Sequence, residues 1–253
     1  ARLELALINF AVETLCEKGY SLTTPPFVMN KEAYEGVVDL SDFEDVMYKV
    51  DDHDLYLIAT SEHPITARFK DEIIELKGGP LKFAGISTNF RKEVGAHGIS
   101  DRGIWRVHQF SKIEQVIFCK PEDSKKMHEE ILNNAIYIFE KLEIPFRVID
   151  ICTGDIGTVA ARKFDIEAWM PSTNKWKEVV SASNCESYQS VRLNMRYRTS
   201  EGTSFPHTLN STAVATTRAL AAILENNQTE NGSVVIPKVL RKWMGNQEII
   251  ESK

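Results

Sequence analysis

The chain begins with apolar residues that recur at spacings including three and four, the period of a helix with one buried face. This pattern runs over residues 3–16, and Gly19 follows as a C-terminal stop, so we predict a helix there. Residues 20–29 have the character of a short strand that two prolines interrupt. The apolar run at residues 55–60 predicts a buried strand, and the helix after it is expected to end before Gly78.

The middle of the chain predicts an antiparallel hairpin. Two runs rich in Phe, Ile, Val and Trp, residues 81–93 and 104–119, are separated by the glycine-bearing loop VGAHGISDRG. The rest of the pattern predicts helices at 121–142 and 212–226 and strands at 146–152, 164–170 and 176–183. Antiparallel strands flanked by helices indicate an α+β fold rather than a parallel sheet wound by βαβ units.

Composition is that of an ordinary packed protein. Of the 253 residues, 43% are hydrophobic and 26% are charged, which excludes disordered and fibrous classes and supplies apolar material for one core. With no internal repeat, low-complexity linker or charge block, residues 1–253 are interpreted as a single domain. No apolar run approaches the roughly 20 residues that span a bilayer, and no basic segment precedes the first helix, so neither a membrane nor export is expected.

The net charge and the cysteine spacing limit which binding partners and which cellular compartment we expect. Thirty Lys and Arg against thirty-six Asp and Glu give a net charge of −6, so contact with a polyanion must be local. Basic residues do gather at 91–112 and at 192–198. The four cysteines occur singly and form no CxxC pair, which argues against a disulfide framework or a zinc ribbon and fits a reducing cytoplasm.

The two arms of the predicted hairpin carry the strongest chemical signal. The chain has no GxGxxG, GxxxxGK[ST], HExxH or GxSxG segment, so a bound nucleotide would require a different kind of binding site. Alternation puts Arg91 and Glu93 on one face of the first arm, and Arg106, Phe110 and Glu114 on one face of the second. Arginine can bind phosphate or carboxylate oxygens and an aromatic ring can stack on a purine, so this is a candidate nucleotide site. A solvent-exposed strand face with paired charges is the alternative.

Three further patches add polar groups. Thr60 and Glu62 stand where the apolar run ends and a helix begins, so they either line a pocket or only belong to the helix terminus. Arg218 lies in a predicted helix otherwise made of Ala, Val, Thr and Leu, where a guanidinium needs an internal carboxylate or a phosphate as partner. Glu178 and Ser181 offer hard oxygen atoms of the kind that Mg²⁺ binds together with substrate phosphates.

Taken in order, these segments resemble the catalytic domain of the class II aminoacyl-tRNA synthetases, and in particular the seryl type of archaea and eukaryotes. GYSLTTPPFVMNKEAYEG resembles motif 1, FRKE with RVHQFSKIEQ resembles motif 2, and HTLNSTAVATTRALAAILE resembles motif 3. The segments TSE, EVVSASNC and NGSVVIPKVLRKWM are similar to seryl-specific sequence. The resemblance covers essentially the whole chain.

The resemblance implies an α+β class II core with an antiparallel β-sheet flanked by helices, and a homodimer built around motif 1. It implies an enzyme, a ligase that activates L-serine with ATP to seryl-adenylate and transfers serine to the 3′-terminal ribose of tRNA(Ser). Mg²⁺ is the expected cofactor, bound with ATP. No zinc is expected, because no histidine or cysteine has a metal-spaced partner.

The resemblance also implies a role for individual residues. Arg91 would bridge the carboxylate of serine and the α-phosphate of ATP, and Arg218 would bind the phosphates, which makes both catalytic. ATP would further contact Glu93, Arg106, Val107, Phe110, Glu178, Val179 and Ser181, with Mg²⁺ held by Glu178 and Ser181. Serine would contact Thr60, Glu62, Arg91, Glu114 and Ser211.

The resemblance leaves two alternatives and one missing part. Synthetases of the seryl type carry an N-terminal coiled-coil arm that binds tRNA(Ser), and residues 1–253 hold no such segment, so we expect residues before Ala1. An armless paralogue that loads an amino acid onto a carrier protein or another acceptor is the first alternative, although its relatives use a zinc pocket that this sequence lacks. A non-catalytic homologue is the second, and the presence of Arg91, Glu93, Glu114 and Arg218 argues against it.

Overall fold

A computed structural model describes residues 1–40, 44–93 and 103–252 of the chain. Its α-helices are α1 (Arg2–Glu17), α2 (Lys31–Val37), α4 (Glu62–Ala67), α5 (Ser124–Lys141), α6 (Tyr188–Arg192) and α7 (Thr216–Asn226). Short 3-10 segments are η1 (Glu44–Val46), η3 (Gly103–Trp105), η4 (Pro121–Asp123) and η5 (Lys238–Met244). Within the described residues, no helix has the length and apolar character needed to cross a membrane.

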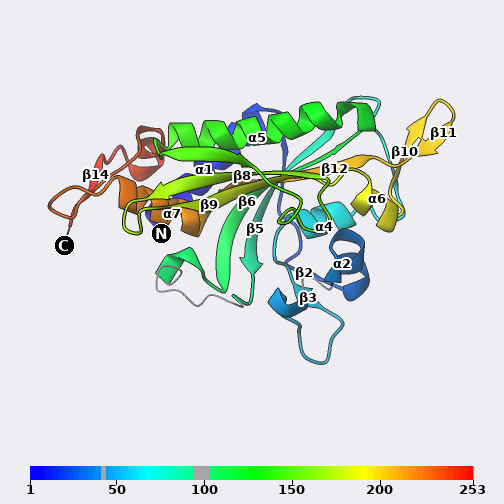
Figure 1. Cartoon of the computed structure of the whole chain (residues 1–253), viewed down its shortest axis with the longest axis horizontal. Helices are drawn as coiled ribbons and strands as arrows, with labels where there is room; N and C mark the ends of the chain where they lie inside the picture. Colours follow the sequence, from blue (N-terminus) through cyan, green and yellow to red (C-terminus); the bar gives the residue numbers. More distant parts are fainter. Residues whose placement is uncertain (41–43, 94–102, 253) are drawn as a thin grey trace.

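The centre of the molecule is one seven-stranded sheet with the order β1-β5-β6-β12-β9-β8-β7. Its strands are β1 (Ser21–Thr23), β5 (Leu81–Phe90), β6 (Gln109–Cys119), β7 (Phe146–Asp150), β8 (Arg162–Met170), β9 (Lys175–Asn184) and β12 (His207–Ala215). All neighbouring strands run antiparallel except β1, which pairs parallel with β5. The predicted α+β fold with an antiparallel sheet is therefore confirmed, and helices flank this sheet (Figure 1).

Small peripheral sheets complete the strands of the described chain. They are β2 (Val28–Met29) with β3 (Tyr56–Leu57), β11 (Gly202–Ser204) with β10 (Arg196–Thr199) and β4 (Ile73–Ile74), and β13 (Val234–Val235) with β14 (Ile249–Ile250). In Figure 1 the β10–β11 hairpin extends from one end of the molecule, and β14 lies near the C-terminus at the other end.

Side-chain alternation along β6 creates two different faces. Ile113, Ile117 and Cys119 belong to the first core, whereas Val116 and Phe118 belong to the second. Residues 110, 112 and 114 share the parity of the second set. One face of the strand therefore packs into the first core, with the buried amide of Gln115 among its apolar residues, while the other is apolar at one end and polar at the end that lies nearer the hairpin loop.

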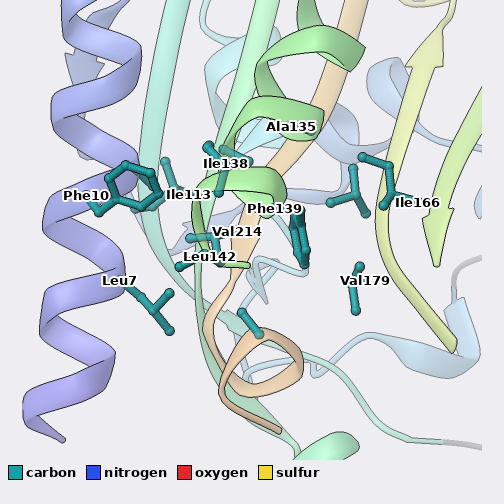
Figure 2. Close-up of a cluster of buried hydrophobic side chains, with 14 of the residues drawn as sticks. Leu7, Phe10, Ile113, Ala135, Ile138, Phe139, Leu142, Ile166, Val179 and Val214 are labelled. Atoms are coloured by element: carbon teal, nitrogen blue, oxygen red, sulfur yellow. The ribbon is translucent and has the colours of Figure 1, made fainter. Parts of the chain in front are cut away.

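The first core lies between this sheet and helices α1, α5 and α7. Leu7 and Phe10 from α1 face Ile138 and Phe139 from α5, and strand residues such as Ile166 close the layer (Figure 2). Each of these side chains is nearly or fully buried, which is worth about 1.5–3 kcal/mol apiece relative to exposure. The sequence of α5 supports this packing because its buried residues recur every three or four positions.

The second core covers the opposite side of the hairpin with α2, α4 and residues near α6. Tyr34, Ile58, Ile65 and Leu193 are buried there against Phe118. The Tyr34 hydroxyl donates to Leu57 O at 3.0 Å, and the oxygen of this hydroxyl accepts a hydrogen bond from Ala59 N at 3.2 Å. This ties α2 to the segment that leads into α4, so the start of α4 has a fixed position over the sheet.

The hairpin arms predicted at 81–93 and 104–119 form strands only at Leu81–Phe90 and Gln109–Cys119, so Arg91, Glu93 and Arg106 lie beyond the strands. Two helix boundaries predicted from the sequence were also wrong. The segment at 212–226 was predicted as one helix, but Thr212 to Ala215 continue β12 and pair with β6, and α7 begins only at Thr216. β-Branched residues in the middle of a sheet are held there by the ladder of the neighbouring strand, which local helix propensity does not reveal.

The second wrong boundary is the end of α4. This helix was expected to continue until just before Gly78, but it stops at Ala67. Asp71 takes a left-handed backbone with φ of 60°, and its N–H donates to Leu193 O at 2.9 Å. The chain then forms β4, which pairs with β10. Pairing with a distant strand therefore ends the helix early.

Candidate active site

A cavity of about 380 Å³ lies over the polar end of the sheet face described above. Strands β6, β9 and β12 form its floor, α4 and the segment after α2 form one wall, and the segment 156–160 before β8 lines it as well. Its residues include Thr60, Glu62, Arg91, Glu93, Val107, Phe110, Lys112, Glu114, Glu178, Val179, Ser181, Cys185, Asn210, Thr212 and Arg218.

Arg91 is held at the end of β5 by contacts that point its guanidinium into the cavity. Its backbone N–H donates to His108 O at 3.1 Å, and its Nε donates to Ala59 O at 3.1 Å. The guanidinium carbon lies 5.4 Å from the centre of the Phe110 ring, as in a cation–π contact. Burial lowers the pKa of Arg91, and the nearby charge of Arg218 lowers it further, whereas the carboxylates of Glu114, Glu178 and Glu93 act in the opposite direction.

Glu114 lies in the interior of the cavity floor and has two partners. Lys112 Nζ approaches Glu114 Oε2 to 2.5 Å, and both side chains are almost completely buried. The Thr212 hydroxyl donates to the same oxygen at 3.3 Å across the β6–β12 pairing. Burial lowers the pKa of Lys112, and the Glu114 carboxylate acts against this. The arrangement leaves Glu114 with a second oxygen that can receive a hydrogen bond from a ligand.

Glu62 is the second carboxylate of this part of the cavity. Burial and then the charge of Glu114 raise its pKa to about 7, while a hydrogen bond from Gln189 and the charges of Lys112 and Arg91 act in the opposite direction. The Gln189 amide donates to Glu62 Oε1 at 2.9 Å. A carboxyl group with such a pKa changes its charge near neutral pH, and a cation placed beside it would hold it ionised.

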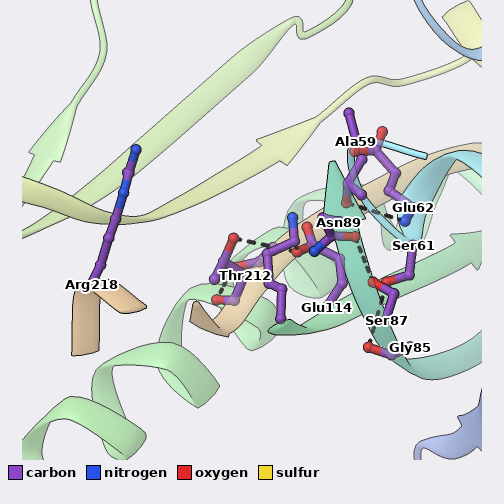
Figure 3. A network of polar contacts seen from close by, with 12 residues as sticks. Ala59, Ser61, Glu62, Gly85, Ser87, Asn89, Glu114, Thr212 and Arg218 are labelled. Atoms are coloured by element: carbon purple, nitrogen blue, oxygen red, sulfur yellow. Dashed lines mark hydrogen bonds and ion pairs between the residues drawn. The ribbon is translucent and has the colours of Figure 1, made fainter. Parts of the chain in front are cut away.

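Arg218 approaches the cavity from α7, apart from the cluster of Glu62, Glu114 and Thr212 (Figure 3). Its Nη1 donates to both the backbone oxygen and Oε1 of Glu178, each at 3.0 Å. Its guanidinium carbon also lies 5.8 Å from the centre of the Trp105 ring. The internal ion pair that the sequence left open is therefore present, and it lies in the wall of the cavity.

Most of the residues that the sequence singled out are brought together here. Thr60, Glu62, Arg91, Glu93, Val107, Phe110, Glu114, Glu178, Val179, Ser181 and Arg218 all line the one cavity. Arg106 does not line it, but its Nη1 donates to Glu93 Oε2 at 3.0 Å. Most of the loop VGAHGISDRG lies outside the described residues.

Ser211 does not lie where the resemblance implied. It was expected beside the bound amino acid, but its side chain is fully buried on the other face of β12, and its hydroxyl donates to Thr212 O at 3.1 Å. Successive residues of a strand point to opposite faces, so Asn210 and Thr212 face the cavity and Ser211 does not. Ser211 was assigned from the resemblance alone, which does not specify the parity of this strand.

Other cavity residues were missed. Lys112 shares parity with Phe110 and Glu114 on β6, so alternation alone could have singled it out. Asn210 and Cys185 meet across the β9–β12 pair, where Asn210 Nδ2 approaches Cys185 Sγ to 3.6 Å. No local signal marks this contact or the lining segment 156–160, because both depend on segments that are distant in the sequence.

Comparisons with known proteins agree with this geometry. The model of the family "tRNA synthetase class II core domain (G, H, P, S and T)" matches residues 46–227. The chain is 59% identical over 251 residues to a serine–tRNA ligase of Methanospirillum hungatei and 54% identical over 250 residues to one of Pyrococcus horikoshii. These matches cover 98% of this chain, but only 59% and 55% of the two relatives.

Solved structures give the same result. The chain superimposes on seryl-tRNA synthetase from Pyrococcus horikoshii, complexed with ATP, with a TM-score of 0.96 and 52% identity, covering all of this chain and 57% of that one. It superimposes on a cytoplasmic serine–tRNA ligase of Naegleria fowleri in complex with AMP with a TM-score of 0.93 and 44% identity, covering 60% of that chain. This chain therefore belongs to the class II tRNA synthetase core domain family and is similar to its serine–tRNA ligases.

Proposed function

We propose that this chain is the catalytic core of a serine–tRNA ligase, which activates L-serine with ATP to seryl-adenylate and transfers serine to the 3′-terminal ribose of tRNA(Ser). The observation that carries the proposal is a single cavity with two charge regions. Carboxylates Glu62 and Glu114 lie in one region with Arg91 beside them, and Arg218 approaches the cavity apart from this cluster (Figure 3). A zwitterionic amino acid next to a polyphosphate has the matching charge pattern.

In this proposal serine binds at the end of the cavity that holds the carboxylates. The ammonium group lies near Thr60 and Glu62, and the hydroxyl reaches Glu114. Thr212, whose hydroxyl already contacts Glu114, takes the place that Ser211 was expected to have. A buried carboxylate left without its partner penalises alanine by up to roughly 10⁴-fold, because an unpaired buried polar group is costly.

ATP binds along the arginines. Phe110 offers its ring to adenine, Glu93 and Val107 contact the adenosine, and Arg218 binds the phosphates. Arg106 reaches the terminal phosphate only if it leaves Glu93, with which it pairs in this structure. Because that pair is partly exposed, breaking it costs little, about 0–1 kcal/mol.

The chemical step needs positioning and charge neutralisation. A carboxylate oxygen of serine forms a bond to the α-phosphorus, the bond to the bridging oxygen breaks, and pyrophosphate leaves with the electron pair. The attacking carboxylate is already ionised, so no general base is required. Arg91 lies where it can contact both anions, and Arg218 offsets the charge on the phosphates.

The residues present fit the divalent cation that such a reaction uses. Glu178 and Ser181 line the cavity from β9. Asp165 is the cross-strand neighbour of Ser181, and its buried Oδ1 has no hydrogen-bond partner among the residues at 1–40, 44–93 and 103–252. Among the residues that the structure describes, no three His, Cys, Asp or Glu side chains form a metal cluster, so phosphate oxygens would have to supply further ligands. When bound there by Glu178 and Ser181, Mg²⁺ would neutralise charge on the phosphates.

The assembly and the acceptor are also part of the proposal. The curated relatives named above are serine–tRNA ligases, which favours tRNA over a carrier protein as acceptor. The chain spans a little less than 60% of the length of these two relatives, so the domain that binds the body of tRNA is expected in other parts of the full protein. A homodimer through residues 19–36 and a cytoplasmic location, where tRNA is charged for translation, complete the proposed function.

Serine-stimulated exchange between ATP and pyrophosphate tests the proposal. We expect the full-length protein to catalyse this exchange with L-serine at least about 10³-fold better than with L-alanine. Radiolabelled serine should then be transferred to tRNA(Ser) and not to a carrier protein. A folded protein without serine-dependent exchange would contradict the assignment, and transfer to carrier protein alone would support the armless paralogue.

A further inference from the structure

Gln189 is a buried residue next to the cavity that the proposed reaction does not use. It belongs to α6, is 1% exposed and does not line the cavity itself. Its amide nitrogen donates to Glu62 Oε1 at 2.9 Å and to Val37 O at 3.0 Å, and its oxygen accepts from the Thr208 hydroxyl at 2.6 Å. One side chain therefore joins α6 to α2, α4 and β12.

These contacts fix which end of the amide faces Glu62. A backbone carbonyl can only accept a hydrogen bond, so Val37 O requires the nitrogen of Gln189 on its side. The Thr208 hydroxyl donates to the remaining oxygen and holds the same orientation. The second N–H is thereby aimed at Oε1 of Glu62, one of the two carboxylates of the amino-acid region.

We infer that Gln189 is the positioning residue of Glu62, and that through this carboxylate it sets how tightly the cavity binds the ammonium group of an amino acid. The inference rests on the proposed function, because that function gives the ammonium group to Glu62. Gln189 itself need not touch the substrate, since the donated hydrogen bond fixes the carboxylate and leaves its other oxygen for the ligand.

The surroundings of Glu62 support this role. Charged and titratable groups from several elements line the cavity together with Glu62: Asp39 after α2, His63 on α4, Arg91 after β5, Lys112 and Glu114 on β6, and Cys185 after β9. Burial and Glu114 raise the pKa of Glu62, whereas the hydrogen bond from Gln189 lowers it. The amide thus favours the ionised carboxylate, which is the form that an ammonium group requires.

The test replaces Gln189 by methionine, which is similar in length but cannot donate a hydrogen bond. In serine-dependent exchange by the full-length protein at pH 7, we expect Gln189→Met to raise the KM for serine about tenfold, the worth of one hydrogen bond to a charged group. The value of kcat and the KM for ATP should change less than about twofold. The rise in KM should be larger at pH 6 and smaller at pH 8.5, because losing the hydrogen bond raises the pKa of Glu62 in the variant and leaves less of the carboxylate ionised at low pH.

A matched control is Gln115→Met. The Gln115 amide is also fully buried, donates to Ile131 O at 3.0 Å and accepts from Asn134 Nδ2 at 2.9 Å, but it lies in the first core. This variant should lose stability without a change in the KM for serine. If Gln189→Met fails to fold, Thr208→Val removes only the hydroxyl that orients the amide, and it should raise the KM in the same direction by a smaller factor.

A double-mutant cycle decides between positioning and a purely structural role. In the Glu62→Gln background, Gln189→Met should not raise the KM for serine further; an equal rise in both backgrounds would overturn the inference. The side-chain ¹³C signal of Glu62 gives a readout independent of activity, and an unchanged pKa in Gln189→Met would also overturn it. Failure of the proposed function would be separate, because the wild-type protein would then show no serine-dependent exchange.

Discussion

At the scale of single residues, the cavity owes its character to charges that are buried close together. Glu62 and Glu114 lie in one region, and burial, followed by repulsion from Glu114, raises the pKa of Glu62 to about 7. Lys112 Nζ lies 2.5 Å from Glu114 Oε2 and balances the charge of that carboxylate, and Arg91 lies at the edge of the same group of charges. Such an arrangement costs stability in the empty protein and is relieved when a ligand of complementary charge binds.

The raised pKa of Glu62 predicts how stability depends on pH. Because the pKa of Glu62 in the folded protein, about 7, lies above the ordinary value of 4.5, protonation of Glu62 stabilises the folded state. This advantage is complete below about pH 4.5 and is lost as pH rises to about 7. We therefore expect Glu62→Gln to increase the free energy of unfolding by about 1–3 kcal/mol at pH 8 and to change it little at pH 4.

Urea denaturation at the two pH values measures this effect. Glu17→Gln is the control, since Glu17 is exposed at the end of α1 and its replacement should give no pH-dependent difference. An equal effect of Glu62→Gln at both pH values would contradict a raised pKa of the buried Glu62 carboxyl group. The same variant should lose affinity for serine, so stability and function are expected to change in opposite directions.

Arg218 gives a second prediction at this scale. If it serves the phosphates, Arg218→Ala should reduce kcat/KM for ATP in the exchange reaction about 10²- to 10³-fold, with a small effect on thermal stability. Arg241→Ala is a matched control: Arg241 has the same side-chain exposure of 23%, pairs with Glu248 and donates to a backbone oxygen, but lies in η5. A drop in Tm for Arg218→Ala much larger than for Arg241→Ala would favour a structural ion pair.

At the scale of elements, the amino-acid region depends on how closely α4 lies on β5. The Ser61 hydroxyl donates to Gly85 O at 3.4 Å, and Gly85 has no side chain to separate the two elements. A Cβ atom at Gly85 would meet Ser61 Oγ at 2.5 Å and Ile65 Cδ1 at 2.7 Å. Thr60 and Glu62 flank Ser61, so the position of the helix sets the position of both.

Gly85→Ala should therefore push α4 away from the sheet. We expect a loss of about 1–3 kcal/mol in the free energy of unfolding, the usual cost of overpacking, and a rise in the KM for serine. Chemical denaturation and the exchange assay measure the two effects. Gly78→Ala is the control, since a Cβ there meets no atom within 4 Å and should leave both values unchanged. A neutral Gly85→Ala would show that α4 can move without consequence.

At the scale of the whole molecule, the proposed dimer concerns the edge of the large sheet. Strand β1 stands last in the strand order beyond β5, and Leu22, Phe27 and Val28 in this region are exposed. Exposed apolar side chains beside an unpaired strand edge suit contact with a second copy of the chain. This is the region of residues 19–36 to which the dimer is assigned.

Leu22→Glu should weaken that dimer, because a charge would be buried without a partner. We expect the dissociation constant measured by sedimentation to rise at least about tenfold. Leu5→Glu is the control: Leu5 is 59% exposed on α1, against 49% for Leu22, and its replacement should not affect assembly. A monomeric wild-type protein would contradict the proposal.

Much of the fold and of the site was accessible from local pattern. The hairpin of β5 and β6 and the shared face of Phe110 and Glu114 follow from a period of two within one segment, whereas Arg91 lies just beyond the end of β5. The boundary errors at α4 and at the start of α7 share one cause, because distant strands pair there and override local preference. Ser211 was assigned from the resemblance alone, and strand parity puts Thr212 in the cavity instead.

The sequence by itself determined the kind of fold and most of the cavity residues, because strand parity and motif order are local properties. Only the tertiary structure decided which residues meet across the chain. Thr212 reaches Glu114 through the β6–β12 register, and Gln189 reaches Glu62 from 127 positions away. These contacts carry the charge balance of the site, and electrostatic interactions depend on distance and burial, which the order of residues does not specify.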